Sequence, residues 1–142
     1  MLLKKVIDES VQRRILFKKV CKAEGKCYKL IIDSGSTDNF VSTKMVDKLN
    51  LKRTIHPKPH RVAWMQIGHQ VLVSEQWKVN FHIEIYQDEI KCDIIEMDAC
   101  HVLLGRPWHL DKYAVHEGNR NSYSFEMNGK KHSIHPIRGK QE

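Results

Sequence analysis

A carboxylate at the end of an apolar run is the first feature of this sequence that could do chemistry. Residues 30–35 read Leu-Ile-Ile-Asp-Ser-Gly, so a run typical of a buried strand delivers Asp33 into a tight turn. Burial disfavours the charged form of a carboxyl group. Such a residue lowers the stability of the fold unless hydrogen bonds compensate, so its presence there suggests a function. Ser36 and Thr37 add hydroxyl groups nearby. The setting suits acid–base catalysis, although a turn aspartate can also simply bond its own backbone.

A second stretch, at residues 101–106, reads His-Val-Leu-Leu-Gly-Arg and is followed by Pro-Trp. The Asp-Ser-Gly-Ser turn at 33–36 resembles the active-site turn of the aspartic peptidases. The Leu-Leu-Gly-Arg stretch resembles the second motif of their retropepsin branch. From Leu30 to Phe125 the chain is similar to the retropepsin-like aspartic protease domain of a gypsy-type LTR-retrotransposon Gag-Pol polyprotein.

The resemblance implies an aspartic peptidase in which Asp33 is the catalytic residue. A chain of 142 residues makes one domain and is too short for two pepsin-like lobes. Asp93 and Asp98 also follow apolar stretches, but neither precedes Ser/Thr-Gly. We therefore expect a second copy of the chain to supply the second carboxylate by two-fold symmetry. The expected partners are a second copy and an extended peptide or polyprotein substrate.

The same resemblance assigns roles to the residues of the active-site turn. Ser34 stands where the family's hydroxyl bonds across the dimer to the partner's backbone, and Gly35 allows the backbone to approach the substrate closely. Ser36 stands where a hydroxyl can donate to the carboxylate of Asp33. Such a bond would favour ionisation and move activity towards acid pH.

The second motif is expected to shape the site. Leu103 and Leu104 would help to form side-chain pockets, and Gly105 completes the motif. Arg106 corresponds to the family's structural arginine, with Asp38 as its expected partner, although a solvated surface arginine is a comparable interpretation.

A hairpin with its tip at Ile67, Gly68 and His69 is the candidate flap, which would close over a bound peptide. An ordinary surface hairpin fits the sequence equally well. His56, His60 and His69 could be taken for a metal or general-base set, but their spacing matches no ligand pattern. We interpret them as loop histidines, and the sequence predicts no metal and no cofactor.

The remaining patterns predict many short strands joined by turns. Alternation is cleanest from Trp77 to Ile85, where apolar residues at every second position indicate a half-buried strand. We expect turns at Glu24-Gly25-Lys26, Asp88-Glu89 and Asn128-Gly129. The expected strands are Ile15–Cys21, Cys27–Ile32, Phe40–Val41, Val62–Ile67, Gln70–Val73, Trp77–Ile85, Ile90–Met97, Leu103–Leu104, Tyr113–His116, Ser122–Met127 and Lys130–Ile134.

Two short helices complete the expected fold. Ser42 or Thr43 can cap a helix that runs to about Leu49, and Gly105–Pro107 opens a second one. The prolines of His56–Pro59 should break regular structure. The fold class is therefore mostly β, a retropepsin-like closed β-barrel (acid protease fold, single lobe) with two short helices.

Composition sets the remaining expectations. The net charge is +7, with basic residues near both ends, which indicates a solvated surface and at most weak, nonspecific nucleic-acid contact. The four cysteines fit no zinc or CxxC spacing and are expected to be reduced and mostly buried. We divide the chain into a basic lead-in (1–13), the protease domain (14–137) and a tail (138–142). Without a signal peptide or membrane span, a cytoplasmic protein is expected, with virus-like particles as an alternative location.

The leading functional hypothesis is a homodimeric aspartic endopeptidase that matures a retrotransposon polyprotein. A rival from another class is a catalytically silent retropepsin-like module for dimerisation or peptide binding. A third hypothesis is a cellular retropepsin-like domain of a larger regulatory protein, such as those of the DNA-damage-inducible family.

Overall fold

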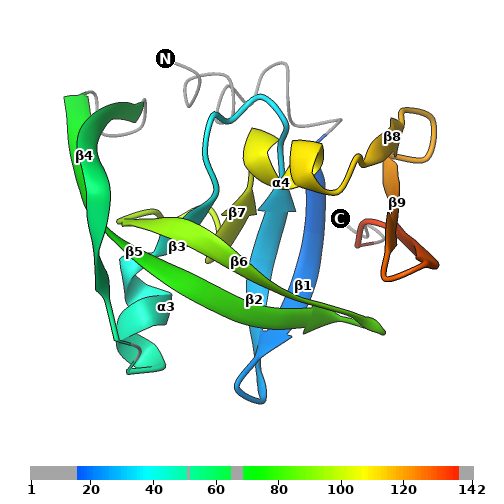
Figure 1. Ribbon diagram of the computed structural model, residues 1–142, viewed down its shortest axis with the longest axis horizontal. Coiled ribbons are helices and arrows are strands. Elements are labelled where there is room, and N and C mark those ends of the chain that lie inside the picture. Colours follow the sequence, from blue (N-terminus) through cyan, green and yellow to red (C-terminus); the bar gives the residue numbers. More distant parts are fainter. Residues whose placement is uncertain (1–15, 51, 65–68, 138–142) are drawn as a thin grey trace.

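The computed structural model describes residues 16–50, 52–64 and 69–137, which form a mostly β domain with two short helices (Figure 1). Seven strands make the main sheet, in the order β1-β2-β7-β3-β6-β5-β4, and three make a second sheet, in the order β10-β9-β8. The elements are β1 (Phe17–Ala23), β2 (Lys26–Ile32), β3 (Phe40–Ser42), α3 (Thr43–Lys48), β4 (Thr54–Trp64), β5 (His69–Ile83), β6 (Tyr86–Ile95), β7 (Val102–Leu104), α4 (Arg106–Asp111), β8 (Val115–Glu117), β9 (Ser122–Met127) and β10 (Lys130–Ile134).

The centre of the main sheet is formed by segments that are far apart in the sequence. Strand β7 pairs in parallel with β2 on one side and antiparallel with β3 on the other, and β3 pairs in parallel with β6. The long strands β5 and β6 cross β1 and β2, and side chains from all four strands share one hydrophobic core (Figure 1). Strand β1 meets β5 at one paired position, Lys22 with His82. The sheet therefore curves back on itself, and its closure into a barrel stays a prediction.

Local sequence signals account for several of these elements. At Glu24 and Gly25 the backbone has φ of 52° and 78°, and at Asn128 and Gly129 it has φ of 55° and 77°, so both hairpins turn through two residues with positive φ. Such turns match the twist of the flanking strands. The N-cap of α3 is Ser42, whose hydroxyl oxygen accepts a hydrogen bond from the backbone N–H of Met45 at 3.1 Å. The predicted hairpins and helix start are confirmed.

One predicted turn is wrong. The chain turns at Glu84 and Ile85, where Glu84 has φ of 55°, and not at Asp88-Glu89. Ile85 is consequently 82% exposed instead of extending the buried face of the strand. Asp88 lies within β6 because its carboxylate accepts a hydrogen bond from the hydroxyl of Tyr86 at 2.7 Å. This local contact, together with the pairing of Asp88 with Phe81 on β5, outweighs the turn preference of an Asp-Glu pair.

The prolines of His56–Pro59 interrupt strand pairing without ending the strand, which corrects the predicted break. Strand β4 runs through them, but its pairing with β5 passes from Ile55–Glu75 to His60–Val73, so the register shifts between these points. Proline has no N–H to donate, so it is tolerated in a strand where the ladder is broken.

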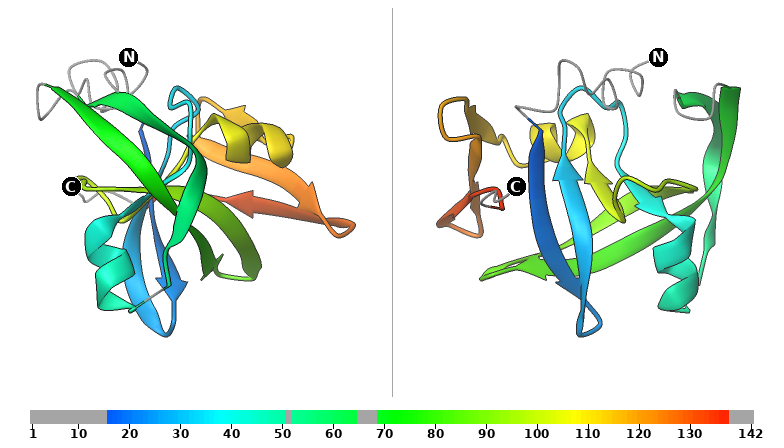
Figure 2. Two further views of the ribbon diagram at one scale, coloured as in Figure 1. Left: turned by 60° about the vertical axis from the view of Figure 1, so that its left-hand side comes forward. Right: turned by 180° about the vertical axis from the view of Figure 1, so that it is seen from behind.

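The second sheet is part of the same core. The ring of Phe17 lies 5.3 Å from that of Tyr123, and Trp108 lies 5.5 Å from Phe125, both in edge-to-face arrangements. Figure 2 shows this sheet beside α4, on the side of the molecule away from the β4–β5 hairpin. The tail sequence after residue 115 therefore covers apolar side chains that the main sheet leaves open.

The cysteines are mostly buried, as predicted: Cys21, Cys92 and Cys100 are buried and Cys27 is exposed. Burial raises the pKa of the Cys21 and Cys100 thiols to about 12. None of the described helices is both long and apolar enough to cross a membrane.

A buried hydrogen-bond chain should contribute measurably to stability. The indole N–H of Trp108 donates to the hydroxyl of Tyr86 at 2.9 Å, and this hydroxyl donates to Asp88. We expect Tyr86→Phe to lower the free energy of unfolding by about 1–3 kcal/mol, since it leaves a buried N–H without a partner. Chemical denaturation measures the change, with Tyr113→Phe as the control, because Tyr113 is 87% exposed. Equal effects in the two variants would contradict the prediction.

Candidate active site

Asp33 is the first residue after β2, and β7 holds it in place. Strand β2 pairs in parallel with β7, so that Ile32 lies opposite Leu104. The backbone N–H of Asp33 donates to the carbonyl oxygen of Leu104 at 2.9 Å. The predicted second motif thus extends the sheet next to the predicted catalytic turn, and the structure brings the two motifs together.

The carboxylate of Asp33 is satisfied on one oxygen only. Its Oδ1 accepts a hydrogen bond from the backbone N–H of Gly35 at 2.8 Å, whereas the buried Oδ2 has no hydrogen-bond partner among the described residues. Burial raises the pKa of this carboxyl group above its usual value, and the bond from Gly35 partly opposes that shift. A buried oxygen without a partner favours a proton, a water molecule or another polar group beside it. The group is therefore suited to proton transfer.

The neighbours of Asp33 differ in what they contribute. The side chain of Ser34 is exposed. A Cβ atom on Gly35 would lie 3.0 Å from Oδ1 of Asp33, so a larger residue there would press on the carboxylate. The predicted bond from Ser36 to Asp33 is wrong: the buried Ser36 hydroxyl donates to the backbone carbonyl of Asp38 at 3.0 Å. Its role is to shape the loop, so it gives no support for ionisation of Asp33.

Gly105 is the closest contact between the second motif and the loop at residues 33–39. Its N–H donates to Oδ1 of the buried Asn39 at 2.7 Å, and the N–H of Arg106 donates to the carbonyl oxygen of Ser36 at 2.8 Å. A Cβ atom on Gly105 would lie 2.2 Å from the carbonyl oxygen of Asp38. Only glycine fits against this backbone. Sequence reasoning missed Asn39, which stands just outside the recognised turn and looks like an ordinary loop residue.

Two other expectations for the second motif are corrected or refined. The side chain of Arg106 is exposed, and no ion pair joins it to Asp38 among the described residues, so the solvated interpretation holds. Leu103 and Leu104 are 2% and 0% exposed and belong to two different core clusters. In the single chain they support the site by packing beneath it.

The hairpin predicted for the flap is present. Strands β4 and β5 pair antiparallel as far as Trp64 and His69. Ile67 and Gly68 lie outside the described residues, so the tip itself is not described. In both figures the upper end of the hairpin and the loop that follows β2 lie at the same end of the molecule (Figures 1 and 2).

One cluster of possible metal ligands lies next to this loop. Ligand atoms of Asp38, His60 and Asp93 all lie within 4.8 Å of one another. The interpretation of His56 and His60 as loop histidines is wrong, because both lie in β4. It did not anticipate the cluster, since the three residues are distant in the sequence and no spacing pattern links them.

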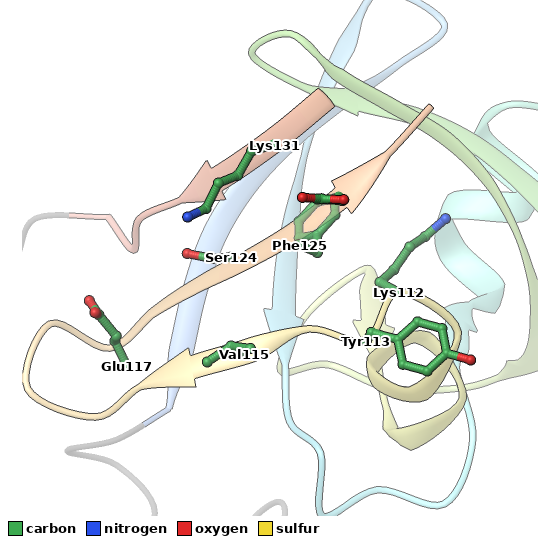
Figure 3. Close-up of a pocket in the computed structure, with 8 residues that line it drawn as sticks. Lys112, Tyr113, Val115, Glu117, Ser124, Phe125 and Lys131 are labelled. Carbon is green, nitrogen blue, oxygen red and sulfur yellow. The ribbon is translucent and has the colours of Figure 1, made fainter. Parts of the chain in front are cut away.

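A hollow of about 600 Å³ lies elsewhere, between the end of α4 and the second sheet (Figure 3). Its lining includes Lys112, Tyr113 and Phe125, and none of the predicted site residues contributes to it. It therefore has no part in the chemistry of Asp33.

Comparison with known families agrees with the geometry. Residues 29–117 match the model of the PEG10/RTL1 protease domain family. The chain belongs to this family. The match covers both the Asp33 turn and the second motif, so the predicted retropepsin-like protease domain is confirmed at the level of the family. The gypsy-type Gag-Pol context stays a prediction.

The fold has a solved counterpart in the retroviral protease-like domain of Ddi1 from Leishmania major. The two share 10% sequence identity with a TM-score of 0.57, over 82% of this chain and 90% of that one. At this identity the similarity shows the fold alone. No curated protein sequence matches the chain.

The contact at Gly105 yields a direct test of how the loop is held. We expect Gly105→Ala to lower the free energy of unfolding by about 2 kcal/mol or more, because its Cβ would overlap a backbone carbonyl. Gly118→Ala is the matched control, since a Cβ there meets nothing within 4 Å, and its effect should stay within about 0.5 kcal/mol. Urea denaturation of both variants measures the difference. A Gly105→Ala protein as stable as the wild type would show that the contact is unimportant.

Proposed function

We propose that the protein is an aspartic endopeptidase that acts as a homodimer, with Asp33 of each chain in a shared catalytic pair. The observation that carries the proposal is the buried Oδ2 of Asp33, which lacks a hydrogen-bond partner among the described residues. It stands at the end of β2 in a domain of a protease family. A second Asp33 carboxyl group and a water molecule would supply what this oxygen lacks.

The proposed reaction needs no covalent intermediate. Two carboxylates facing each other at short range cannot both ionise, so they share one proton and titrate as a pair. The ionised member takes a proton from water, which attacks the carbonyl carbon of the scissile peptide bond. The protonated member stabilises the developing oxyanion and then protonates the leaving nitrogen.

The second carboxylate is proposed to come from another chain because the buried alternative, Asp93, is not followed by Ser/Thr-Gly and one of its two oxygens is already held. Oδ1 of Asp93 accepts a hydrogen bond from Gln76 and lies 3.2 Å from Nε2 of His56. In the dimer, Ser34 is free to bond the partner's backbone. The β4–β5 hairpin would act as the flap over an extended peptide, with a polyprotein of the retrotransposon type as the proposed substrate.

Cleavage by matched aspartate variants tests the proposal. We expect Asp33→Asn to reduce cleavage of a peptide library by about 10³-fold or more between pH 4 and pH 7, because the variant lacks the acid–base group. Asp111→Asn, which changes an exposed aspartate at the end of α4, should cleave like the wild type. Light scattering of the same samples reports the oligomeric state.

The outcomes separate the two classes of function. Cleavage that persists in Asp33→Asn would exclude Asp33 as the catalyst. A wild-type dimer that cleaves no peptide would favour the silent module for dimerisation or peptide binding.

The raised pKa of Asp33 also predicts how stability depends on pH. A carboxyl group whose pKa is higher in the folded state than in the unfolded state destabilises the fold once the pH rises through the folded value. We expect Asp33→Asn to be more stable than the wild type at pH 7, with the difference shrinking as the pH falls towards 4. Denaturation of both proteins across this range measures it. A wild type more stable than Asp33→Asn at pH 7 would mean that the charged form is favoured in the fold.

A further inference from the structure

We propose that Asp38, His60 and Asp93 bind a divalent transition-metal ion of the Zn²⁺ class, which ties the β4–β5 hairpin to the loop that carries Asp33. The proposal does not depend on the proposed peptidase activity, since none of the three residues belongs to the catalytic pair. It rests on how the fold assembles these residues and on one unsatisfied buried oxygen.

Strand pairing brings the three residues together. Strands β3 and β6 pair so that Phe40 lies opposite Asp93, and the N–H of Asp93 donates to the carbonyl oxygen of Asn39 at 2.9 Å. Asp38, two residues before Phe40, therefore lies beside Asp93. On the other side of β6, Gln76 of β5 pairs with Asp93, and His60 of β4 pairs with Val73, three residues earlier in β5. The imidazole of His60 spans this offset, and its Nε2 lies 3.8 Å from Oδ2 of Asp93.

The distances between ligand atoms suit a bridging cation better than direct hydrogen bonds. Nε2 of His60 lies 3.9 Å from Oδ2 of Asp38 and 3.8 Å from Oδ2 of Asp93. Both separations exceed the range of a hydrogen bond. Tetrahedral zinc with bonds of about 2.0–2.1 Å separates its ligand atoms by about 3.4 Å, so the two His60 separations need to shorten by about half an ångström. All three ligand atoms lie within 4.8 Å of one another, so a movement of the partly exposed Asp38 side chain would complete the set.

The imidazole of His60 is oriented as a ligand. Its Nδ1 lies 2.9 Å from the carbonyl oxygen of Lys58, which can only accept, so the proton is on Nδ1. In the neutral ring Nε2 then presents a lone pair towards two carboxylates. Histidines that bind metals characteristically donate their other ring N–H to a carbonyl or carboxylate in this way.

The independent observation is the state of Asp93. Its side chain is 6% exposed, and Oδ2 has no hydrogen-bond partner among the described residues, although it faces His60. The other oxygen, Oδ1, accepts a hydrogen bond from Nε2 of Gln76 at 3.2 Å and lies 3.2 Å from Nε2 of His56. One oxygen is thus fixed from behind while the other is left free and aimed at the cluster. A second layer of hydrogen bonds of this kind orients a ligating carboxylate.

The donor set narrows the choice of ion. An imidazole nitrogen favours zinc and the later transition metals over Mg²⁺ and Ca²⁺, which prefer oxygen ligands alone. Three protein ligands leave a fourth position for water. Asp38 and His60 are partly exposed, with side chains 35% and 37% accessible, so an ion can enter from solvent.

Calorimetric titration of the full chain with ZnCl₂, after treatment with a chelator, tests the proposal. We expect one zinc ion per chain, a rise in melting temperature on binding, and little competition from excess Mg²⁺. His60→Gln should weaken binding more than tenfold, and His56→Gln by about 10-fold, as expected of an outer residue that orients a ligand. His82→Gln, an exposed histidine on β5, should bind like the wild type.

Two further variants keep the result decisive. Asp93→Asn should abolish zinc binding, and circular dichroism checks that this variant folds. His60→Gln, at a partly exposed position, tests the same site without disturbing a buried group. Asp33→Asn should retain zinc binding, so a loss in that variant would place the ion at the catalytic turn and overturn the proposal. Absence of zinc binding by the wild type, or equal binding by His60→Gln, would overturn it as well. In that case the cluster is an ion pair between a protonated His60 and the two carboxylates.

Discussion

The site depends on one constraint, which is the close contact between Gly105 and the backbone of the loop at residues 33–39. The loop has no regular structure of its own, so its polar backbone groups must find partners elsewhere. The carbonyl of Leu104 accepts from the N–H of Asp33 at 2.9 Å, and the N–H of Arg106 donates to the carbonyl of Ser36 at 2.8 Å. Between them, the N–H of Gly105 donates to the side-chain oxygen of Asn39 at 2.7 Å. Strand β7 and the start of α4 thereby fix a loop that would otherwise have many conformations, and a side chain at residue 105 would force the two segments apart.

Fixing the loop allows the protein to keep an unfavourable group at its centre. The Oδ2 atom of Asp33 is buried and has no hydrogen-bond partner within the described part of the chain, which costs free energy in the isolated chain. The apolar surroundings that raise its pKa come from the same strands that form the core. Side-chain packing elsewhere offsets the stability lost at this position. One example is the edge-to-face contact between the rings of Trp108 and Tyr123. Such an arrangement is typical of sites built for chemistry rather than for stability.

The sequence was sufficient to predict what short-range signals encode. The Glu24-Gly25 and Asn128-Gly129 turns, the Ser42 cap and the recognition of the two motifs all follow from residues close together in the chain or from the family resemblance. The pairing of the two motifs is seen only in the structure. The failures have two physical causes. Asp88 and Ser36 bond partners only two residues away, the hydroxyl of Tyr86 and the carbonyl of Asp38, and turn preference does not specify such local side-chain bonds. Asp93 faces the imidazole of His60, which is distant in the sequence, and periodicity carries no information about such a partner.

The loop carries one carboxyl group of each proposed site, Asp33 of the catalytic pair at its start and Asp38 of the metal cluster near its end. The hydroxyl of Ser36 donates to the carbonyl of Asp38, and its own carbonyl accepts from Arg106, so the loop between them is bonded on both sides. Binding of an ion at Asp38 would therefore displace Asp33 little, because these bonds hold the loop between them. The hairpin is bonded less continuously, because β4 pairs with β5 only on either side of its proline-containing segment. A cation held by Asp38, Asp93 and His60 would consequently act on the position of β4, and its effect on the chemistry of Asp33 would come through access to the site.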